Sequence, residues 1–204
     1  MFDLRRVHAS YPITGAMHVG GFRGEELNQY RAIGLTNTIL FEPQPELYEH
    51  IKAKCLFDEV VHNVALGSKD STEKMYVSWR EGGIMNGSGA SSSLLKPKKH
   101  LTEHPEVTFP EEIEVEVNTL EQYYKEGFNF LNIDVQGYEL EVLRGASNVL
   151  DKIDALIVEV NRDEVYEGCP MIEEIDTFLK SFGISRVQEI WQSTSWGDAL
   201  YARN

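Results

Sequence analysis

Short apolar runs alternate along this chain with segments in which apolar residues recur every three to four positions. The short runs are typical of buried strands, and the spaced pattern is typical of helices that cover a sheet. Strands are predicted over residues 15–19, 38–41, 59–64, 72–79, 113–117, 128–133, 155–160, 185–191 and 199–203. Helices are predicted over residues 25–33, 45–54, 138–143 and 172–180, with a short helix capped by Thr119 and Gln122.

The order of these elements predicts an α/β protein with a mostly parallel sheet. Pro45 stands where a helix can begin, and Gly34 and Gly183 stand where helices can end. The last two strand patterns are expected to close around a turn at Trp196–Asp198. We therefore predict a doubly wound sheet of about seven strands, with the last strand antiparallel.

Residues 80–110 interrupt this regularity. The segment is rich in glycine, serine and proline and has little periodicity. Long irregular segments in compact domains are commonly functional loops. We expect a lid or substrate loop here, inserted into a single domain that spans residues 1–204.

The composition narrows the classes of partner. A chain of 204 residues with 42% hydrophobic residues suits one domain with its own core. Its formal net charge of −14 repels phosphate backbones, so nucleic acid is not expected as the main partner. The basic cluster Lys96, Lys98, Lys99 and His100 is either a local nucleic-acid site or a solvated loop.

Cysteines and leader signals add two expectations. Cys55 and Cys169 have neither a disulfide-framework pattern nor the spacing of zinc ligands. The first residues lack the apolar stretch of a signal peptide, and no run approaches the ~20 apolar residues of a membrane span. We expect a cytoplasmic protein with no membrane partner.

A glycine-rich turn, Met17–Glu25, joins the first predicted strand to the first predicted helix. Gly20, Gly21 and Gly24 allow a sharp turn and a close approach to a ligand, and the helix offers free N–H groups. A tight packing turn would show the same glycines. The register differs from G-x-G-x-x-G, and no P-loop lysine follows. His18 is either a proton acceptor or a hydrogen-bonded residue at the end of the strand.

Glu42 ends the next predicted strand. Acidic side chains at this place accept hydrogen bonds from ribose hydroxyls in nucleotide-binding sheets. The alternative is a solvent-facing glutamate before a proline. Together with the glycine turn, Glu42 favours an adenosine-bearing cofactor.

Two further carboxylates, Asp134 and Glu159, lie at or near the ends of apolar strands. Ligands of open α/β sheets bind beyond the carboxyl ends of the strands. The pair could orient a cationic sulfonium, bind a metal or take a proton from a hydroxyl. Helix capping or a buried salt bridge would also explain them. Carboxylates without histidines at ligand spacing leave metal assistance open, and no metal site is predicted.

With these residues in place, the sequence from about Ala16 to Arg203 resembles the FkbM family of S-adenosylmethionine-dependent methyltransferases. The most specific stretch, Asn132–Ala146, is similar to the family's strand–Asp–Gly–Glu block and the Leu–basic–Gly–Ala turn after it. Shorter similar segments are Phe41–Pro45, Asn63–Gly67, Ser91–Leu94 and Val117–Leu120. The chain departs from the family's usual residues at His18, Gly21, Phe22, Asn132 and Gln136.

The resemblance implies a Rossmann-like class I methyltransferase fold with S-adenosylmethionine as cofactor. It also implies, most often, O-methylation of a sugar or another small-molecule hydroxyl. The residues expected at the cofactor are His18, Gly20, Gly21, Gly24, Glu25, Glu42, Pro43, Asn63, Val64, Ala65, Asp134 and Gln136. Within this set Glu42 would hold the ribose, and Asn63 to Ala65 would border the adenine.

The resemblance also gives expectations for the reaction. Asp134 is the expected base or orienting group, and Glu159 is the second candidate. Ser92, Ser93 and Glu139 are the residues expected at the substrate. Two other functions stay open: a methyltransferase-like protein that binds cofactor without catalysis, and an NAD or nucleotide-sugar enzyme on a similar sheet.

Overall fold

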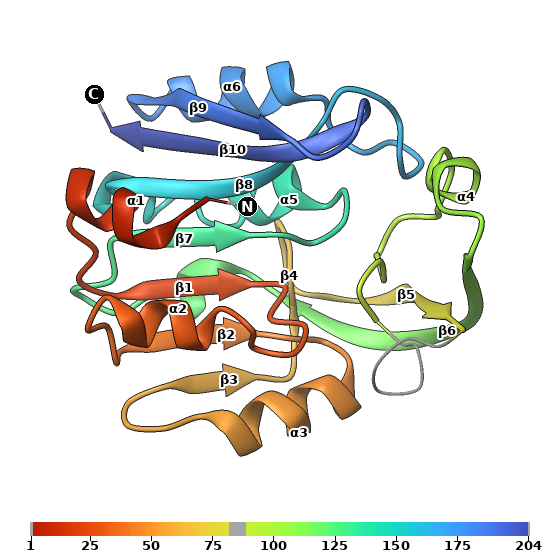
Figure 1. The fold of residues 1–204 in the computed structure, drawn as a ribbon, viewed down its shortest axis with the longest axis horizontal. Helices are drawn as coiled ribbons and strands as arrows, with labels where there is room; N and C mark the ends of the chain where they lie inside the picture. The colour runs from red at the N-terminus through yellow and green to blue at the C-terminus, as the bar shows by residue number, and fades with distance from the viewer. Residues whose placement is uncertain (1, 82–88, 204) are drawn as a thin grey trace.

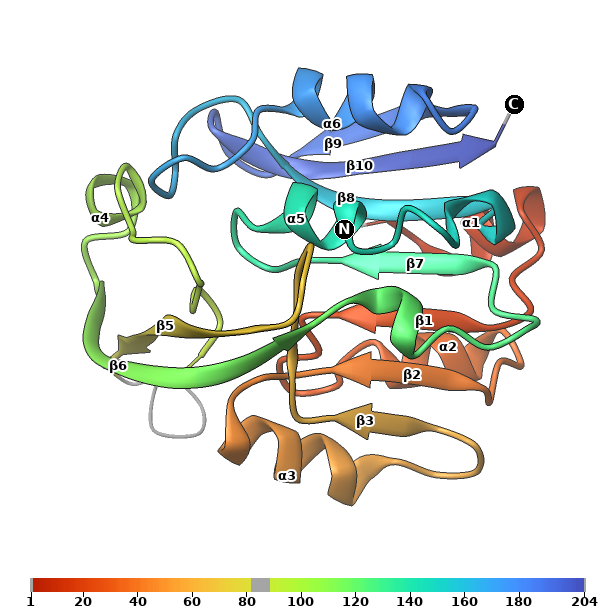
Figure 2. The ribbon, with the colours of Figure 1, turned by 180° about the vertical axis from the view of Figure 1, so that it is seen from behind.

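A computed structural model describes residues 2–81 and 89–203. Within them, a seven-stranded sheet has the order β3-β2-β1-β7-β8-β10-β9 (Figures 1 and 2). Its strands are β1 (Ala16–Val19), β2 (Thr38–Phe41), β3 (Val60–His62), β7 (Phe130–Ile133), β8 (Ala155–Asn161), β9 (Ile184–Trp191) and β10 (Trp196–Arg203). The five neighbouring strands β3, β2, β1, β7 and β8 pair in parallel. β10 is antiparallel to both β8 and β9. The doubly wound sheet with an antiparallel last strand is confirmed.

Helices cover both faces of this sheet. The helices are α1 (Leu4–Ser10), α2 (Leu27–Ala32), α3 (Pro45–Lys54), α5 (Glu139–Arg144) and α6 (Ile172–Lys180), with the 3-10 turns η2 (Leu120–Gln122) and η3 (Leu150–Lys152). Because side chains alternate along a strand, Ala16 and Met17 of β1 face opposite ways. Ala16 packs in one cluster with Val7 of α1 and Tyr30 of α2, and Met17 packs in another with Val142 of α5. The helix α1 was not predicted.

A second sheet stands beyond the carboxyl ends of the parallel strands (Figure 1). It has three strands in the order β4-β6-β5: β4 (Ala65–Leu66), β5 (Ser71–Arg80) and β6 (Val107–Asn118). The predicted strands 72–79 and 113–117 belong to this sheet rather than to the main one, and both are longer than predicted. Every second residue of β6 from Glu112 to Glu116 is exposed, as the alternating pattern indicated.

The predicted irregular segment 80–110 is partly regular. β5 runs to Arg80, a short helix α4 (His100–Glu103) follows, and β6 begins at Val107. Its glycines Gly82, Gly83 and Gly87 lie outside the described residues. The part from residue 89 onward is held by backbone hydrogen bonds to the β8–α6 loop: Lys98 N to Val165 O (3.0 Å), His100 N to Val165 O (3.1 Å) and Glu167 N to Lys96 O (2.8 Å). In the structure this part is docked against the core.

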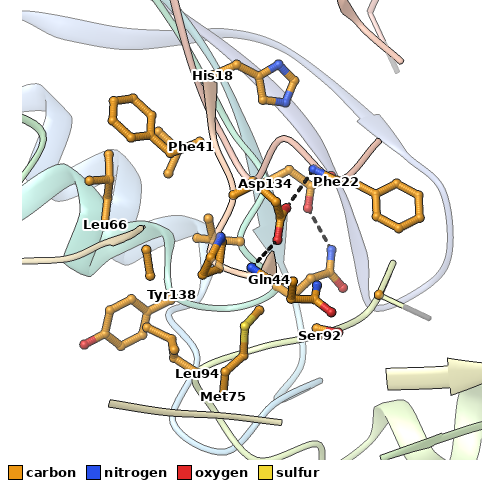
Figure 3. Close-up of a pocket in the computed structure, with 18 of the residues that line it drawn as sticks. His18, Phe22, Phe41, Gln44, Leu66, Met75, Ser92, Leu94, Asp134 and Tyr138 are labelled. Carbon is orange, nitrogen blue, oxygen red and sulfur yellow. Dashed lines mark hydrogen bonds between the residues drawn. The ribbon is translucent and has the colours of Figure 1, made fainter. Parts of the chain in front are cut away.

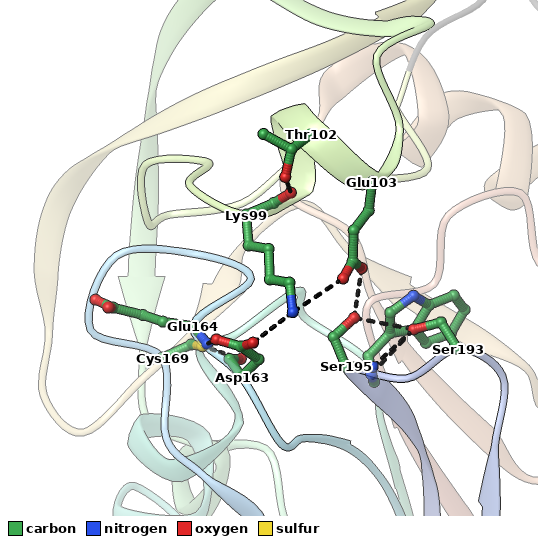
Figure 4. Close-up of polar contacts among 9 residues, drawn as sticks. Lys99, Thr102, Glu103, Asp163, Glu164, Cys169, Ser193 and Ser195 are labelled. Carbon is green, nitrogen blue, oxygen red and sulfur yellow. Dashed lines mark hydrogen bonds and ion pairs between the residues drawn. The ribbon is translucent and has the colours of Figure 1, made fainter.

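Two lysines of the basic cluster on this segment are paired with carboxylates, and Figure 4 shows the contacts of Lys99. Lys98 forms an ion pair with Glu164, and Lys99 pairs with Asp163 and Glu103. Glu103 also accepts a hydrogen bond from Ser195. The arrangement joins α4 to the β8–α6 loop and the β9–β10 turn, which fits the solvated-loop interpretation of these lysines.

Two local predictions were wrong. Trp196–Asp198 lies within β10, and the turn falls before it, where Ser193 Oγ accepts from Ser195 N (3.1 Å) and Trp196 N (3.2 Å). A Cβ at Gly197 would lie 2.4 Å from Ile190 O, so this glycine permits close strand packing rather than a turn.

The predicted capping box at Thr119 is also absent. Gln122 Nε2 donates to the Thr119 hydroxyl (3.1 Å) instead of capping the backbone, and a single 3-10 turn follows.

Among the described residues, no helix has the length and apolar character needed to cross a membrane.

Candidate active site

The carboxyl ends of β1, β2 and β7 meet at one edge of the main sheet. The strand order turns at β1, which lies between β2 and β7, and crevices at such points bind ligands. Gly20, Glu42 and Asp134 each directly follow one of these strands. A cavity of about 220 Å³ lies between them and the second sheet (Figure 3). The sheet therefore brings the three main sequence predictions to one place.

The glycine turn contains one glycine that lines the cavity and two that pack against α3. Gly20 lines the cavity and has φ +87°, and a Cβ there would lie 1.8 Å from Asp134 O. Gly21 and Gly24 do not line it; added Cβ atoms would meet Ile51 of α3 at 3.0 and 3.4 Å. The packing interpretation thus describes Gly21 and Gly24, whereas Gly20 allows the turn to pass against the end of β7.

Glu42 is buried in the wall of this cavity, at 3% exposure. Its Oε2 accepts from Phe22 N (2.9 Å), and its Oε1 accepts from Gln44 N (2.9 Å). Each oxygen keeps a second lone pair for a further donor. The solvent-facing alternative for Glu42 is excluded, and the carboxylate can accept from two adjacent hydroxyls, as a ribose presents them.

Burial raises the pKa of Glu42 from 4.5 to about 7. Between these pH values the folded protein holds more protons than the unfolded chain, so the free energy of unfolding falls as pH rises from about 5 to 7. The full shift corresponds to about 3 kcal/mol. We expect this slope to be shallower in Glu42→Gln than in the parent protein, measured by urea unfolding of the ligand-free protein at pH 5, 6, 7 and 8. The exposed Glu49→Gln is the matched control, and equal slopes in all three proteins would contradict the assignment.

Gln136 links the two predicted catalytic carboxylates. Its Nε2 donates to Asp134 Oδ1 (2.7 Å) and to Glu159 Oε2 (2.8 Å). Burial and the nearby Asp134 charge raise the pKa of Glu159 well above its ordinary value. Glu159 is 5% exposed, whereas Asp134 is exposed. The raised pKa favours the neutral form of Glu159, and Asp134 is the accessible carboxyl group of the pair.

The backbone of Gln136 adopts a left-handed conformation, with φ +56°. Ser93 Oγ donates to its carbonyl (2.7 Å), and Tyr166 OH donates to its Oε1 (3.0 Å). These contacts join the inserted segment and the β8–α6 loop to the turn after β7. They fix the amide that contacts both carboxylates.

Several predicted residues lie beside the cavity rather than at its surface. Asn63 Nδ2 donates to the carbonyls of Glu42 and Pro43, both at 2.9 Å, and does not line the cavity. Glu139 is fully buried, and its Oε1 accepts from Val135 N (3.1 Å) and Gly137 N (3.0 Å). Both side chains hold the turns on which lining residues stand.

Other predicted residues do line the cavity. These are His18, Glu25, Pro43, Val64, Ala65, Ser92, Asp134 and Gln136. His18 is 2% exposed, and its Nδ1 lies 3.0 Å from Tyr30 OH and 3.3 Å from Asn132 Nδ2, so it is a hydrogen-bonded residue of the strand. Ser93 is buried, and its hydroxyl bonds the Gln136 carbonyl. It lines neither this cavity nor the second cavity described below.

The apolar wall of the cavity, and the side that Gly89 closes against Phe22 and Gln44, were not predicted. The wall residues that the sequence analysis missed include Phe41, Leu66, Met75 and Leu94, which Figure 3 places around one end of the cavity. Gly89 helps to close that side, where a Cβ would lie 3.2 Å from Phe22 Cε2 and 3.3 Å from Gln44 Nε2. The alternation of β5 gives a signal for the buried Met75, but no local pattern points Leu94 or Gly89 toward the cavity.

A second cavity of about 460 Å³ adjoins the first. The two share Phe22, Ala90, Asp134 and Gln136. Beyond this common wall, the second cavity is lined by residues that include Trp79, Arg80, His100, His104, Glu159 and Trp196. Within residues 2–81 and 89–203, no group of three or more His, Cys, Asp or Glu side chains is placed to hold a metal ion.

Comparisons with known proteins identify the family of this chain. The family model described as the methyltransferase FkbM domain matches residues 18–185. The 2-O-methyltransferase NoeI of Sinorhizobium fredii (strain NBRC 101917 / NGR234) is 33% identical over 96 residues, which are 45% of this chain and 40% of NoeI.

Two solved structures share the fold. Methyltransferase FkbM from Methylobacillus flagellatus KT has a TM-score of 0.60 at 13% identity, over 93% of this chain and 43% of that one. Magnesium protoporphyrin IX methyltransferase (ChlM) from Synechocystis PCC 6803, solved with bound SAM, has a TM-score of 0.54 at 10% identity, over 98% and 74%. The matched parts are thus less than half the length of NoeI and of the FkbM structure.

Proposed function

This chain belongs to the FkbM family of methyltransferases and uses S-adenosylmethionine, and from that premise we propose that it methylates a hydroxyl of a small molecule such as a sugar. The observation that carries the proposal is the wall shared by two cavities, with the accessible Asp134 in it. The name of NoeI, a 2-O-methyltransferase, supports oxygen as the acceptor atom.

The first cavity suits the cofactor. Glu42 has free lone pairs for the two ribose hydroxyls, and the apolar side chains of Val64, Leu66 and Met75 offer a surface for the adenine. Gly20 leaves backbone space beside the methionine portion. When bound, the cofactor supplies an electrophilic methyl group.

The shared wall suits the transfer. Asp134 accepts the proton of the acceptor hydroxyl as its oxygen takes the methyl group, and Gln136 holds the carboxylate in place through its Nε2. Glu159 is the weaker candidate for the base, because it is buried and its raised pKa favours its neutral form. The chain thus contributes mainly position and one proton acceptor.

Glu42→Ala tests the cofactor site. Loss of a charged hydrogen-bond acceptor should weaken S-adenosylmethionine binding by about 1.5–3 kcal/mol, measured by isothermal titration calorimetry. Glu49→Ala, on the exposed side of α3, should bind as the parent protein does. An unchanged affinity in Glu42→Ala would mean that the ribose lies elsewhere.

A turnover assay separates an enzyme from a protein that only binds cofactor. The parent protein is incubated with radiolabelled S-adenosylmethionine and a panel of sugars, and label transferred to a sugar oxygen supports the proposal. Cofactor binding without transfer to any hydroxyl of a broad panel would favour the binding-only alternative.

A further inference from the structure

The second cavity has two chemically different ends. The near end, at the shared wall, holds Asp134, Gln136 and Glu159. The far end is formed around α4 and the start of β6. There Arg80 pairs with Val107 across the second sheet, and the His100 and His104 rings lie 5.0 Å apart. Both ends line one continuous space.

The buried side chain of Tyr166 lies between His100 of the far end and Gln136 of the near end. The His100 ring centre lies 5.5 Å from that of Tyr166, and Tyr166 OH lies 3.0 Å from Gln136 Oε1. Gln136 Nε2 then lies 2.7 Å from Asp134 Oδ1. These contacts link the two ends of the second cavity through buried side chains, so a molecule with its reacting hydroxyl at Asp134 has to extend through the cavity to reach the far end.

The Nδ1 atom of His100, at the far end, has no hydrogen-bond partner in the part of the chain that the structure describes. The residue is 4% exposed, and its ring lines the second cavity. Burial lowers the pKa of His100 to about 4, so the ring is neutral at physiological pH and has an N–H to donate. The neutral ring lines the cavity, so its N–H can be donated to a ligand group there when the hydrogen is on the nitrogen that faces the cavity.

Arg80 adds a positive charge to the far end. Among the described residues, no carboxylate forms an ion pair with Arg80, although the chain as a whole is strongly acidic. Glu106 also lines this end, and a backbone hydrogen bond together with the Arg80 charge lowers its pKa, so an anion there has to contact the Arg80 guanidinium on the side away from Glu106. Arginine suits phosphate and carboxylate because its planar donors bind two oxygens at once.

We propose that the far end of the second cavity binds an anionic group, phosphate or carboxylate, on the methyl acceptor. The acceptor is then an acidic sugar derivative whose anionic group lies well away from the methylated hydroxyl. Arg80 and the His100 N–H hold the anion, and Asp134 holds the reacting end. This inference rests on the proposed function, because it takes the second cavity as the acceptor site.

The test compares the binding of matched probes to protein saturated with S-adenosylhomocysteine. It is done at low salt, because salt screens the attraction between an anionic group and Arg80. The probes are glucose 6-phosphate, glucuronic acid and neutral glucose, with Kd measured by calorimetry. We expect at least one acidic probe to bind at least 10-fold more tightly than glucose, the lower end for one charged hydrogen bond. Arg80→Ala should abolish this difference, and His100→Phe should reduce it.

Arg5→Ala, an exposed change on α1, is the matched control and should keep the preference. If neither acidic probe binds more tightly than glucose, or if Arg80→Ala keeps the preference, the inference is wrong while the cofactor site stands. If S-adenosylhomocysteine itself does not bind, the proposed function fails first. The two failures are therefore distinguishable.

Discussion

Asp134→Asn should lower kcat by a factor of about 10² to 10⁴, the usual contribution of a general base. Asparagine keeps an oxygen that can accept from Gln136 Nε2, now at 2.7 Å, so the turn after β7 should hold its shape. It cannot take the proton of an acceptor hydroxyl. The rate is measured at saturating S-adenosylmethionine with the best acceptor from the turnover panel.

The control for this variant is Asp154→Asn. Asp154 is also an exposed aspartate beside a strand of the main sheet, but it lies at the opposite end, where Oδ2 accepts from Asn129 Nδ2 (2.8 Å). Its replacement should leave kcat within about twofold, since surface changes away from a site have small effects. A fully active Asp134→Asn protein would remove Asp134 from the reaction.

Gly20→Ala should destabilise the fold by about 3 kcal/mol or more. The φ of +87° costs a side-chain-bearing residue about 1–2 kcal/mol. The new Cβ would also lie 1.8 Å from Asp134 O, so either β1 or β7 must move. The measurement is urea unfolding, and cofactor binding should be lost in the same variant because the moved carbonyl belongs to the shared wall.

Gly34→Ala separates the cost of the positive φ from the cost of the close contact. Gly34 has a similar φ of +82°, but an added Cβ meets nothing within 4 Å. This variant should lose only the conformational part, about 1–2 kcal/mol. If both alanine variants lose the same stability, close packing between the glycine turn and β7 has no part in the effect.

The main sheet and its three strand-end residues could be predicted because their signals are local. Gly20, Glu42 and Asp134 each follow a short apolar run, and parallel strands bring their carboxyl ends to one edge. The helix α3 was predicted at its full length because Pro45 fixes its start. For these strand ends and for the start of α3, the neighbouring residues are sufficient to predict the local structure.

The second sheet and the second cavity depend on distant contacts. The pattern of β6 indicates a strand with one wet face, but it does not say that Ser71 of β5 lies opposite Val117. Trp79, His100 and Trp196 come from three separate parts of the chain and meet only through the docked segment. Gly197 was mistaken for a turn because its real cause, the carbonyl of Ile190, lies on the neighbouring strand.

The small overlap between the two cavities has an evolutionary consequence. Four residues, Phe22, Ala90, Asp134 and Gln136, belong to both, and the remaining walls are separate. With the donor in the first cavity and the acceptor in the second, as proposed, a substitution at Trp79 or Arg80 alters the choice of acceptor without touching a contact to the methyl donor. A descendant lineage can change its product one mutation at a time and remain a working donor-binding protein at every step.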